Sequence, residues 1–274
     1  MPKNVKKQIL YSIILYLLFF LFYPVIVSFV QNFLTNVLGW DIHVNSRFGG
    51  HQAAYWFVRA MLRFVLSIIA IILFGVIIQT NGFKYSFKLK GFQKGLLAIS
   101  PIFLIIIICL ALLFNISEFN MYFAYYIPYI ILFDIATGIY EEVIYRAIPL
   151  TALLYYFGNS TKGKLILTLV TSVIFGFAHY SAGVDAILVA SLMGISFSAV
   201  YIYSKNLLAC MIYHTLWNIG TQITLGLTTS VYSGTLDSAL HLSINIMWLI
   251  IMPIFSIILI VKSKPFSEDV NLYP

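Results

Sequence analysis

Charged residues are scarce in this chain. Only 9% of the 274 residues are Asp, Glu, Lys or Arg, whereas 61% belong to the hydrophobic class. Soluble domains carry about 25% charged and about 45–50% apolar residues. The sequence has too few polar side chains to cover a water-facing surface of this size, and it therefore predicts a membrane protein.

Cysteine is also nearly absent. Cys109 and Cys210 are the two cysteines, and both lie inside apolar runs. Two cysteines in such positions cannot form a disulfide framework, and the sequence has no Cys/His cluster typical of a structural metal site. We interpret both as small buried apolar side chains.

Eight long apolar segments are present, and a membrane-spanning helix needs about 20 such residues. The segments lie at roughly 8–30, 56–79, 95–114, 122–157, 164–180, 184–204, 206–224 and 241–261. The fourth is too long for one straight crossing, and we expect Pro149 to break it and leave a second piece along the cytoplasmic interface. The first has no cleavage site of small residues and is expected to be retained.

The lysines predict the orientation of these segments. If the N-terminus is cytoplasmic, all 12 lysines fall on the cytoplasmic side, at 3–7, 84–94, 162–164, 205 and 262–264. The opposite loops carry no lysine, as the positive-inside rule requires. The predicted fold class is therefore all-α: one polytopic membrane domain over residues 1–274, with about eight transmembrane helices and both termini cytoplasmic. Topology accounts for the net charge of +7, so the expected partner is the lipid bilayer and not nucleic acid.

Ionisable residues inside membrane spans are energetically costly and are functional hypotheses by default. The sequence places Asp134, Glu141, Glu142 and Arg146 in the fourth span, His179 in the fifth and His214 in the seventh. We interpret Arg59 and Arg63, near the outer end of the second span, as side chains that snorkel to the interface.

Residues four apart share one face of a helix. This spacing relates Phe175 to His179, and His214 to Asn218. It also relates Glu142 to Arg146, which we interpret as a structural ion pair.

A glutamate, two histidines and an asparagine on three spans are suited to peptide hydrolysis. Glu141 with a neighbouring histidine can activate water, and a second histidine and an amide are natural donors to an oxyanion. Zinc is an alternative, with Glu141, His179 and His214 as ligands. We expect a metal-free site, because no His-x-x-x-His spacing is present and Asn218 is not a usual orienting partner for a zinc-bound histidine.

Other classes of intramembrane protease fit the sequence less well. It has no HExxH zinc motif and no GxGD aspartyl motif. Gly194-Ile195-Ser196-Phe197 loosely resembles the serine segment of rhomboid proteases. We interpret that glycine and serine as helix-packing residues.

Three motifs in this order, on separate spans, resemble the CPBP family of intramembrane proteases: Glu141-Glu142-x-x-x-Arg146, Phe175-x-x-x-His179 and His214-x-x-x-Asn218. The family includes the CAAX prenyl endopeptidase and bacterial CAAX-like or Abi proteases, and it is often labelled metalloprotease. The resemblance covers a catalytic core at 120–224. It implies that Glu141 is the catalytic carboxylate and His179 helps to activate water. It further implies that His214 and Asn218 stabilise the oxyanion, while Glu142 and Arg146, with Phe175 beside them, support the helix geometry.

The substrate class that follows is a membrane-associated or lipophilic peptide, such as a prenylated tail or a pheromone or bacteriocin precursor. Lysine outnumbers arginine 12 to 4, which suggests an AT-rich bacterial genome and hence a multi-pass protein of a bacterial plasma membrane. Two other functions remain open. One is a non-catalytic immunity or scaffold protein. The other is a proton-coupled transporter using Asp134, Glu141 and His179, which the lack of internal repeats disfavours.

Overall fold

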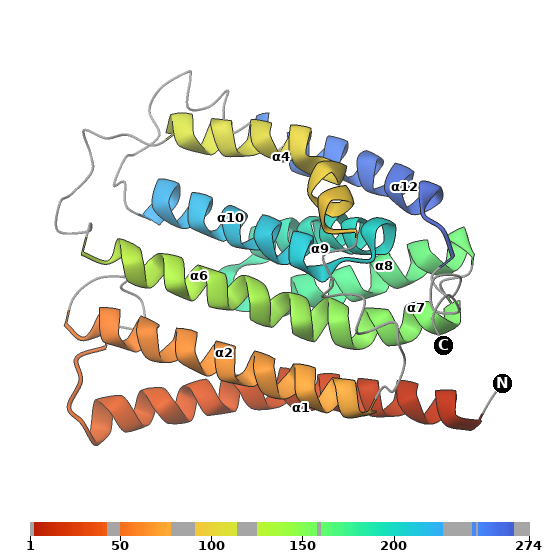
Figure 1. The fold of residues 1–274 in the computed structure, drawn as a ribbon. Helices are drawn as coiled ribbons and strands as arrows, with labels where there is room; N and C mark the ends of the chain where they lie inside the picture. Colours follow the sequence, from red (N-terminus) through yellow and green to blue (C-terminus); the bar gives the residue numbers. More distant parts are fainter. Residues whose placement is uncertain are drawn as a thin grey trace.

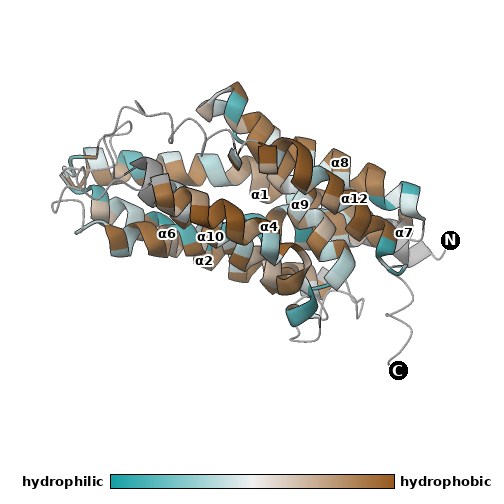
Figure 2. Cartoon of the chain, turned by 90° about the horizontal axis from the view of Figure 1, so that it is seen from above, coloured by the Kyte–Doolittle hydropathy of each residue, from teal (hydrophilic) through white to brown (hydrophobic). Residues whose placement is uncertain are grey.

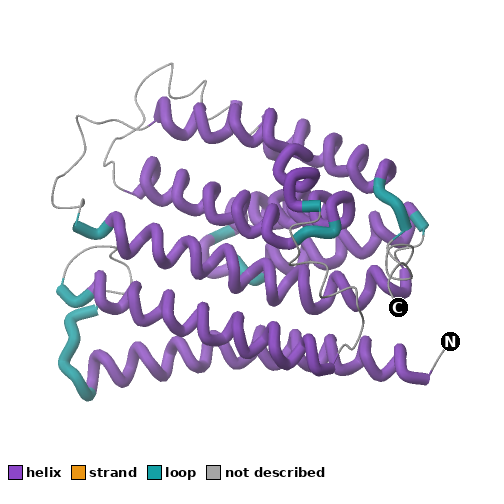
Figure 3. Tube along the Cα trace, viewed as in Figure 1, coloured by secondary structure: helices purple, strands orange, loops and turns teal. Residues whose placement is uncertain are grey.

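The computed structural model describes residues 3–42, 50–77, 91–113, 125–157, 160–226, 243–244 and 246–265. Within these ranges all regular structure is helical (Figures 1 and 3). The predicted all-α fold class is confirmed.

The helices follow the predicted segments closely. They are α1 (Lys3–Asn36), α2 (Gln52–Ile77), α4 (Phe92–Leu113), α6 (Ile127–Glu142), the π-helix η2 (Val143–Leu150), α7 (Thr151–Phe157), α8 (Thr161–Phe177), the 3-10 helix η3 (Tyr180–Ala182), α9 (Val184–Ser204), α10 (Leu207–Gly226), the π-helix η4 (Met247–Ile251) and α12 (Met252–Lys262). The fourth predicted segment corresponds to α6, η2 and α7 together, and the eighth to η4 and α12. Each of the eight predicted segments thus coincides with helix in the described part of the chain, although residues 178–179, at the end of the fifth segment, form a turn.

The outer surface of the bundle is apolar. Phe29 on α1 is 70% exposed and Val76 on α2 is 68% exposed, and apolar residues run along most of the length of the helices (Figure 2). Contiguous apolar surface of this extent suits lipid and not water. By length and composition, four of the described helices can cross a membrane, namely Ile9–Asn36, Gln52–Val76, Phe92–Leu112 and Val184–Ser204, and Met247–Lys262 is a shorter apolar helix.

The interior contains polar side chains. Ser12, Ser196 and Ser256 are each 0% exposed, and the Ser256 hydroxyl donates to the Met252 carbonyl one turn earlier on its own helix. Such internal hydrogen bonds are what a low-dielectric environment requires of buried polar groups. Cys109 and Cys210 are buried free thiols, as the sequence predicts.

Pro149 does not break the fourth helix. The chain stays helical from 127 to 157, with Pro149 inside η2. The backbone N–H of Thr151 donates to the Arg146 carbonyl five residues earlier, which is the wider hydrogen-bond register of a π-helix. Because that register has already shifted, the chain accommodates the proline's missing N–H without ending the helix. The predicted break is therefore wrong.

The described lysine-bearing ends meet at one end of the bundle. Lys164 Nζ, at the start of α8, donates to the carbonyl of Ser263 (2.8 Å) just after α12. Lys205 Nζ, after α9, donates to the Pro265 carbonyl (2.9 Å). The start of α1 also lies at this end (Figure 1), as the predicted alternation requires. Residues 84–90 lie outside the described residues, and the cytoplasmic location of this end remains a prediction.

Candidate active site

Helices α6 and α10 approach each other closely at the candidate site. A Cβ atom on Gly138 would lie 2.5 Å from Thr215 Oγ1 and 3.2 Å from the Met211 carbonyl oxygen. Only glycine allows the two helix backbones to come this near. One turn further along α6 lies Glu142, and its Oε1 is 2.8 Å from His214 Nδ1 on α10.

Glu142 is therefore more than the partner of Arg146. Its Oε1 accepts from Arg146 Nη1 at 3.0 Å, and also from His214. Glu142 is 0% exposed and the His214 side chain 2%. An ionised carboxylate only accepts hydrogen bonds, so the contact assigns a proton to Nδ1 of His214. The Nε2 atom of His214 then faces Glu141 Oε2, at 3.5 Å.

His179 reaches the same oxygen from another direction. Helix α8 ends at Phe177, so His179 lies just beyond the helix and caps η3. Its Nδ1 is 2.9 Å from the Phe175 carbonyl oxygen, which can only accept and thus assigns a proton to Nδ1. Its Nε2 lies 3.8 Å from Glu141 Oε2. The four-residue spacing of Phe175 and His179 thereby orients the imidazole, although through the backbone of Phe175.

The side chain of Phe175 fills the space between the charged groups. It is 1% exposed, and its ring centroid lies 4.8 Å from that of His179 and 5.9 Å from that of His214. The Arg146 guanidinium lies over the same ring at 4.2 Å. An aromatic ring packed in this way limits the rotation of both imidazoles and stacks favourably with the cation.

Three potential acceptor atoms thus converge at Glu141. Its Oε2 is buried and has no hydrogen-bond partner among the described residues, and the two imidazole nitrogens at 3.5 and 3.8 Å are beyond hydrogen-bond length. With Nδ1 protonated on both rings, a neutral histidine presents only a lone pair to the carboxylate. The arrangement requires an additional proton, a water molecule or a cation at this point.

A zinc ion is one candidate for that position. Zinc-bound histidines usually donate their other nitrogen to a carboxylate or a carbonyl, and His214 and His179 do so to Glu142 and Phe175. The structure therefore removes one of our sequence arguments against zinc. Even so, no group of three or more His, Cys, Asp or Glu side chains in the described part of the chain is placed to hold a metal ion. The donor types fit zinc but their spacing does not, and both the metal-free site and zinc remain predictions.

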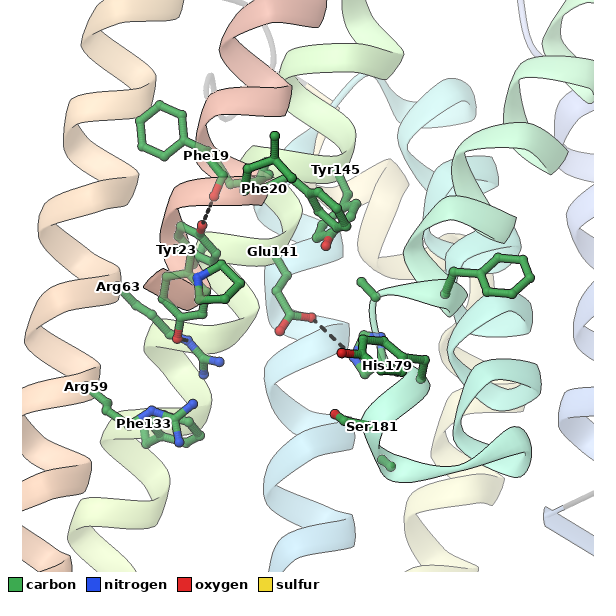
Figure 4. A pocket seen from close by; sticks show the side chains of 18 residues that line it. Phe19, Phe20, Tyr23, Arg59, Arg63, Phe133, Glu141, Tyr145, His179 and Ser181 are labelled. Carbon is green, nitrogen blue, oxygen red and sulfur yellow. Dashed lines mark hydrogen bonds and ion pairs between the residues drawn. The ribbon is translucent and has the colours of Figure 1, made fainter. Parts of the chain in front are cut away.

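A cavity of about 630 Å³ opens beside Glu141 and His179 (Figure 4). Residues of α1, α2 and α6 and of the turn around η3 line it. Neither His214 nor Asn218 belongs to this lining. Asn218 lies half-buried one turn after His214, and its carbonyl accepts from Thr221 Oγ1 at 3.1 Å. The structure thus brings Glu141, His179 and His214 together, with Asn218 further along α10.

Arg59 and Arg63 also line this cavity, and the prediction that they snorkel to the membrane interface is wrong. Arg63 is only 7% exposed. Its Nε donates to the Tyr23 hydroxyl at 2.6 Å and its Nη1 donates to the Thr137 hydroxyl. Both guanidinium groups lie over the ring of Phe133, at 5.0 Å for Arg59 and 4.3 Å for Arg63.

The arginines turn inward because α1 and α6 offer them hydroxyl and aromatic partners. The sequence contains one signal for this arrangement, since both residues are charged and lie within an apolar span. The contacts themselves join helices that are distant in the sequence, and no local spacing predicts them.

A protein-family comparison gives a match over part of the chain. Residues 122–220 match the family described as type II CAAX prenyl endopeptidase Rce1-like. This stretch runs from just before α6 into α10 and contains all three motifs. No curated protein and no solved structure matches the chain.

Proposed function

Since residues 122–220 belong to the Rce1-like family of type II CAAX prenyl endopeptidases, whose members are intramembrane proteases, we propose that Glu141 and His179 activate water for peptide hydrolysis in this chain. The observation that carries the proposal is the position of Glu141 Oε2. It lies between two imidazole nitrogens, at 3.5 and 3.8 Å, on the wall of a cavity large enough for part of a peptide.

The proposed first step is proton abstraction from water. A water molecule in the cavity hydrogen-bonds to Glu141 Oε2 and His179 Nε2, both of which can accept from it. Glu141 takes one proton while the water oxygen forms a bond to the peptide carbonyl carbon. The π electrons of the carbonyl move onto its oxygen. His179 stays oriented because its Nδ1 donates to the Phe175 carbonyl.

The second step returns that proton. The carbon–nitrogen bond of the tetrahedral intermediate breaks, and the protonated Glu141 gives its proton to the leaving amine. The products are a carboxylic acid and an amine, and Glu141 is again a carboxylate. The two steps together consume one water molecule and need no other reactant.

A donor role for His214 requires a proton on its Nε2 in addition to the one that its Nδ1 donates to Glu142. The buried Glu142–Arg146 pair and this hydrogen bond hold the His214 ring so that its Nε2 is directed toward Glu141 Oε2, at 3.5 Å.

His214 and Asn218 are the proposed oxyanion donors. Both lie on α10, and neither faces the described cavity. The substrate carbonyl would therefore have to enter between Glu141 and α10 in order to reach them.

The surroundings of the cavity favour a lipophilic substrate. A second, smaller groove of about 270 Å³ lies between α1 and α2, and its lining is apolar. Phe19 and Tyr23 line both the groove and the catalytic cavity. An apolar segment or attached lipid could lie in the groove while the peptide reaches Glu141, so we propose a membrane-associated peptide as substrate.

The test is a comparison of membrane peptides from cells with wild-type protein and with Glu141→Gln. The variant keeps the shape and hydrogen bonding of the side chain but removes the base, so the protein should accumulate normally while uncut precursors appear. Asp185→Asn is the matched control, because it makes the same chemical change at an exposed position on α9.

The same comparison separates the alternative functions. A scaffold or immunity protein would leave the peptide profile unchanged in Glu141→Gln. A proton-coupled transporter would lose uptake and accumulate no precursor. Cleavage by Glu141→Gln at the wild-type rate would refute the proposed mechanism.

A further inference from the structure

Two cations share the cavity with the proposed catalytic carboxylate. Arg59 and Arg63 approach it from α2, and Glu141 approaches from α6 (Figure 4). Among the described residues, neither guanidinium forms an ion pair with a carboxylate, and Arg59 Nε is buried without a hydrogen-bond partner. The family match begins at residue 122, so it assigns no role to α2.

Unpaired cations in a low-dielectric interior are costly. The rings of Phe133 and Tyr23 offset part of this cost through cation–π contacts. Hydroxyl partners offset another part for Arg63. Arg59 has the ring and hydroxyl of Tyr55 beside it, but its Nε is buried without a hydrogen-bond partner. A carboxylate is the ligand that the planar guanidinium binds best.

We propose that Arg59 and Arg63 form a subsite that binds a carboxylate of the peptide substrate. This inference rests on the proposed function, since it assumes that the cavity receives a peptide. The carboxylate can come from the free C-terminus of the chain or from an acidic side chain near it.

The spacing along α6 sets the distance to the cleaved bond. Thr137, which contacts Arg63, lies four residues before Glu141, and Phe133, which contacts both arginines, lies eight residues before it. At about 1.5 Å per helical residue, the subsite is about 6–12 Å from Glu141 along the helix. An extended peptide covers about 3.3 Å per residue. The bound carboxylate would therefore lie about two to four residues from the scissile bond.

The experiment measures peptide binding to purified Glu141→Gln protein in detergent micelles, where the probe is not cleaved. Three fluorescent apolar peptides are compared by anisotropy: one with a free C-terminal carboxylate, one with a C-terminal amide, and one with a C-terminal amide and glutamate as its last residue. Because charge-assisted hydrogen bonds are the strong ones, the free acid should bind about 10- to 100-fold more tightly than the plain amide.

Adding Arg59→Gln should shrink that preference to within about threefold, whereas Arg59→Lys should retain part of it. Lys162→Gln is the matched control, since it removes one positive charge at an exposed site outside the cavity. For Arg63→Gln, peptide binding and thermal unfolding are measured together. Arg63 also ties α2 to α1 and α6, so the unfolding measurement separates lost binding from lost stability.

Tight binding of the glutamate peptide would assign the subsite to acidic side chains in general. Weak binding of that peptide would assign it to the terminal carboxylate. Equal binding of all three peptides, or a preference that survives in Arg59→Gln and in the double variant with Arg63→Gln, would overturn the proposal. Binding here does not depend on hydrolysis, so its failure is distinguishable from failure of the proposed protease activity.

Discussion

Replacing Arg146 with methionine should strongly destabilise the folded protein. Arg146 is 1% exposed, pairs with Glu142 at 3.0 Å and stacks on Phe175 at 4.2 Å. Methionine keeps most of the volume but leaves the buried Glu142 with His214 as its remaining described donor. Breaking a buried ion pair on one side typically costs about 3–5 kcal/mol, and the lost stack adds about 0.5–2 kcal/mol.

The free energy of unfolding can be measured by reversible denaturation in mixed micelles, followed by tryptophan fluorescence. We expect Arg146→Met to lower it by about 3.5–7 kcal/mol, the sum of the two losses. The double variant Glu142→Gln with Arg146→Met removes both charges and should recover most of that loss, because no unpaired buried ion remains. Lys162→Met is the surface control, with an expected change within about 0.5 kcal/mol.

Two results would refute this reasoning. One is a loss below about 1 kcal/mol in Arg146→Met, which would mean that Glu142 is not held as a buried ion. The other is a loss of unfolding free energy in the double variant that equals the sum of the losses in Glu142→Gln and Arg146→Met alone. In that case the two side chains would act independently, and the contact at 3.0 Å would carry no coupling energy.

Three further predictions concern chemistry and topology. Asn218→Ala should lower turnover about 100- to 1000-fold in a kinetic assay, with folding and substrate capture largely intact; lost binding with unchanged turnover would instead place Asn218 in substrate recognition. Activity should persist in purified protein shown by metal analysis to lack zinc; about one zinc per chain, with activity abolished by a chelator and restored by zinc, would contradict the metal-free mechanism. Reporter fusions after Lys90, Lys162 and Lys205 should all report a cytoplasmic location, and one clear external signal would contradict the eight-span topology.

The positions of the helices could be predicted from composition and hydropathy alone. A chain with 9% charged residues can satisfy its backbone in lipid only as helices or as a closed barrel, and long apolar runs indicate helices. The alternation of the lysines predicted which helix ends meet, and the contacts of Lys164 and Lys205 agree with it. Hydropathy and lysine position are properties of short segments, so they can be predicted without knowing which helices pack together.

Four-residue spacing also predicted real neighbours. Glu142 and Arg146 pair, and Phe175 orients His179. The same rule could not predict that Glu142 binds His214, 72 residues away. That contact depends on Gly138, which lets α6 approach the backbone of α10.

Other features of the site were decided by tertiary structure. Pro149 would end an isolated α-helix, but here a π-helical register accommodates it. Arg59 and Arg63 would snorkel on a single helix in lipid, whereas Tyr23 and Phe133 on neighbouring helices turn them inward. The sequence by itself therefore determined the lipid environment, the helices and the candidate chemical groups. Only packing between helices decided which groups face the cavity, because those contacts join residues that no local pattern relates.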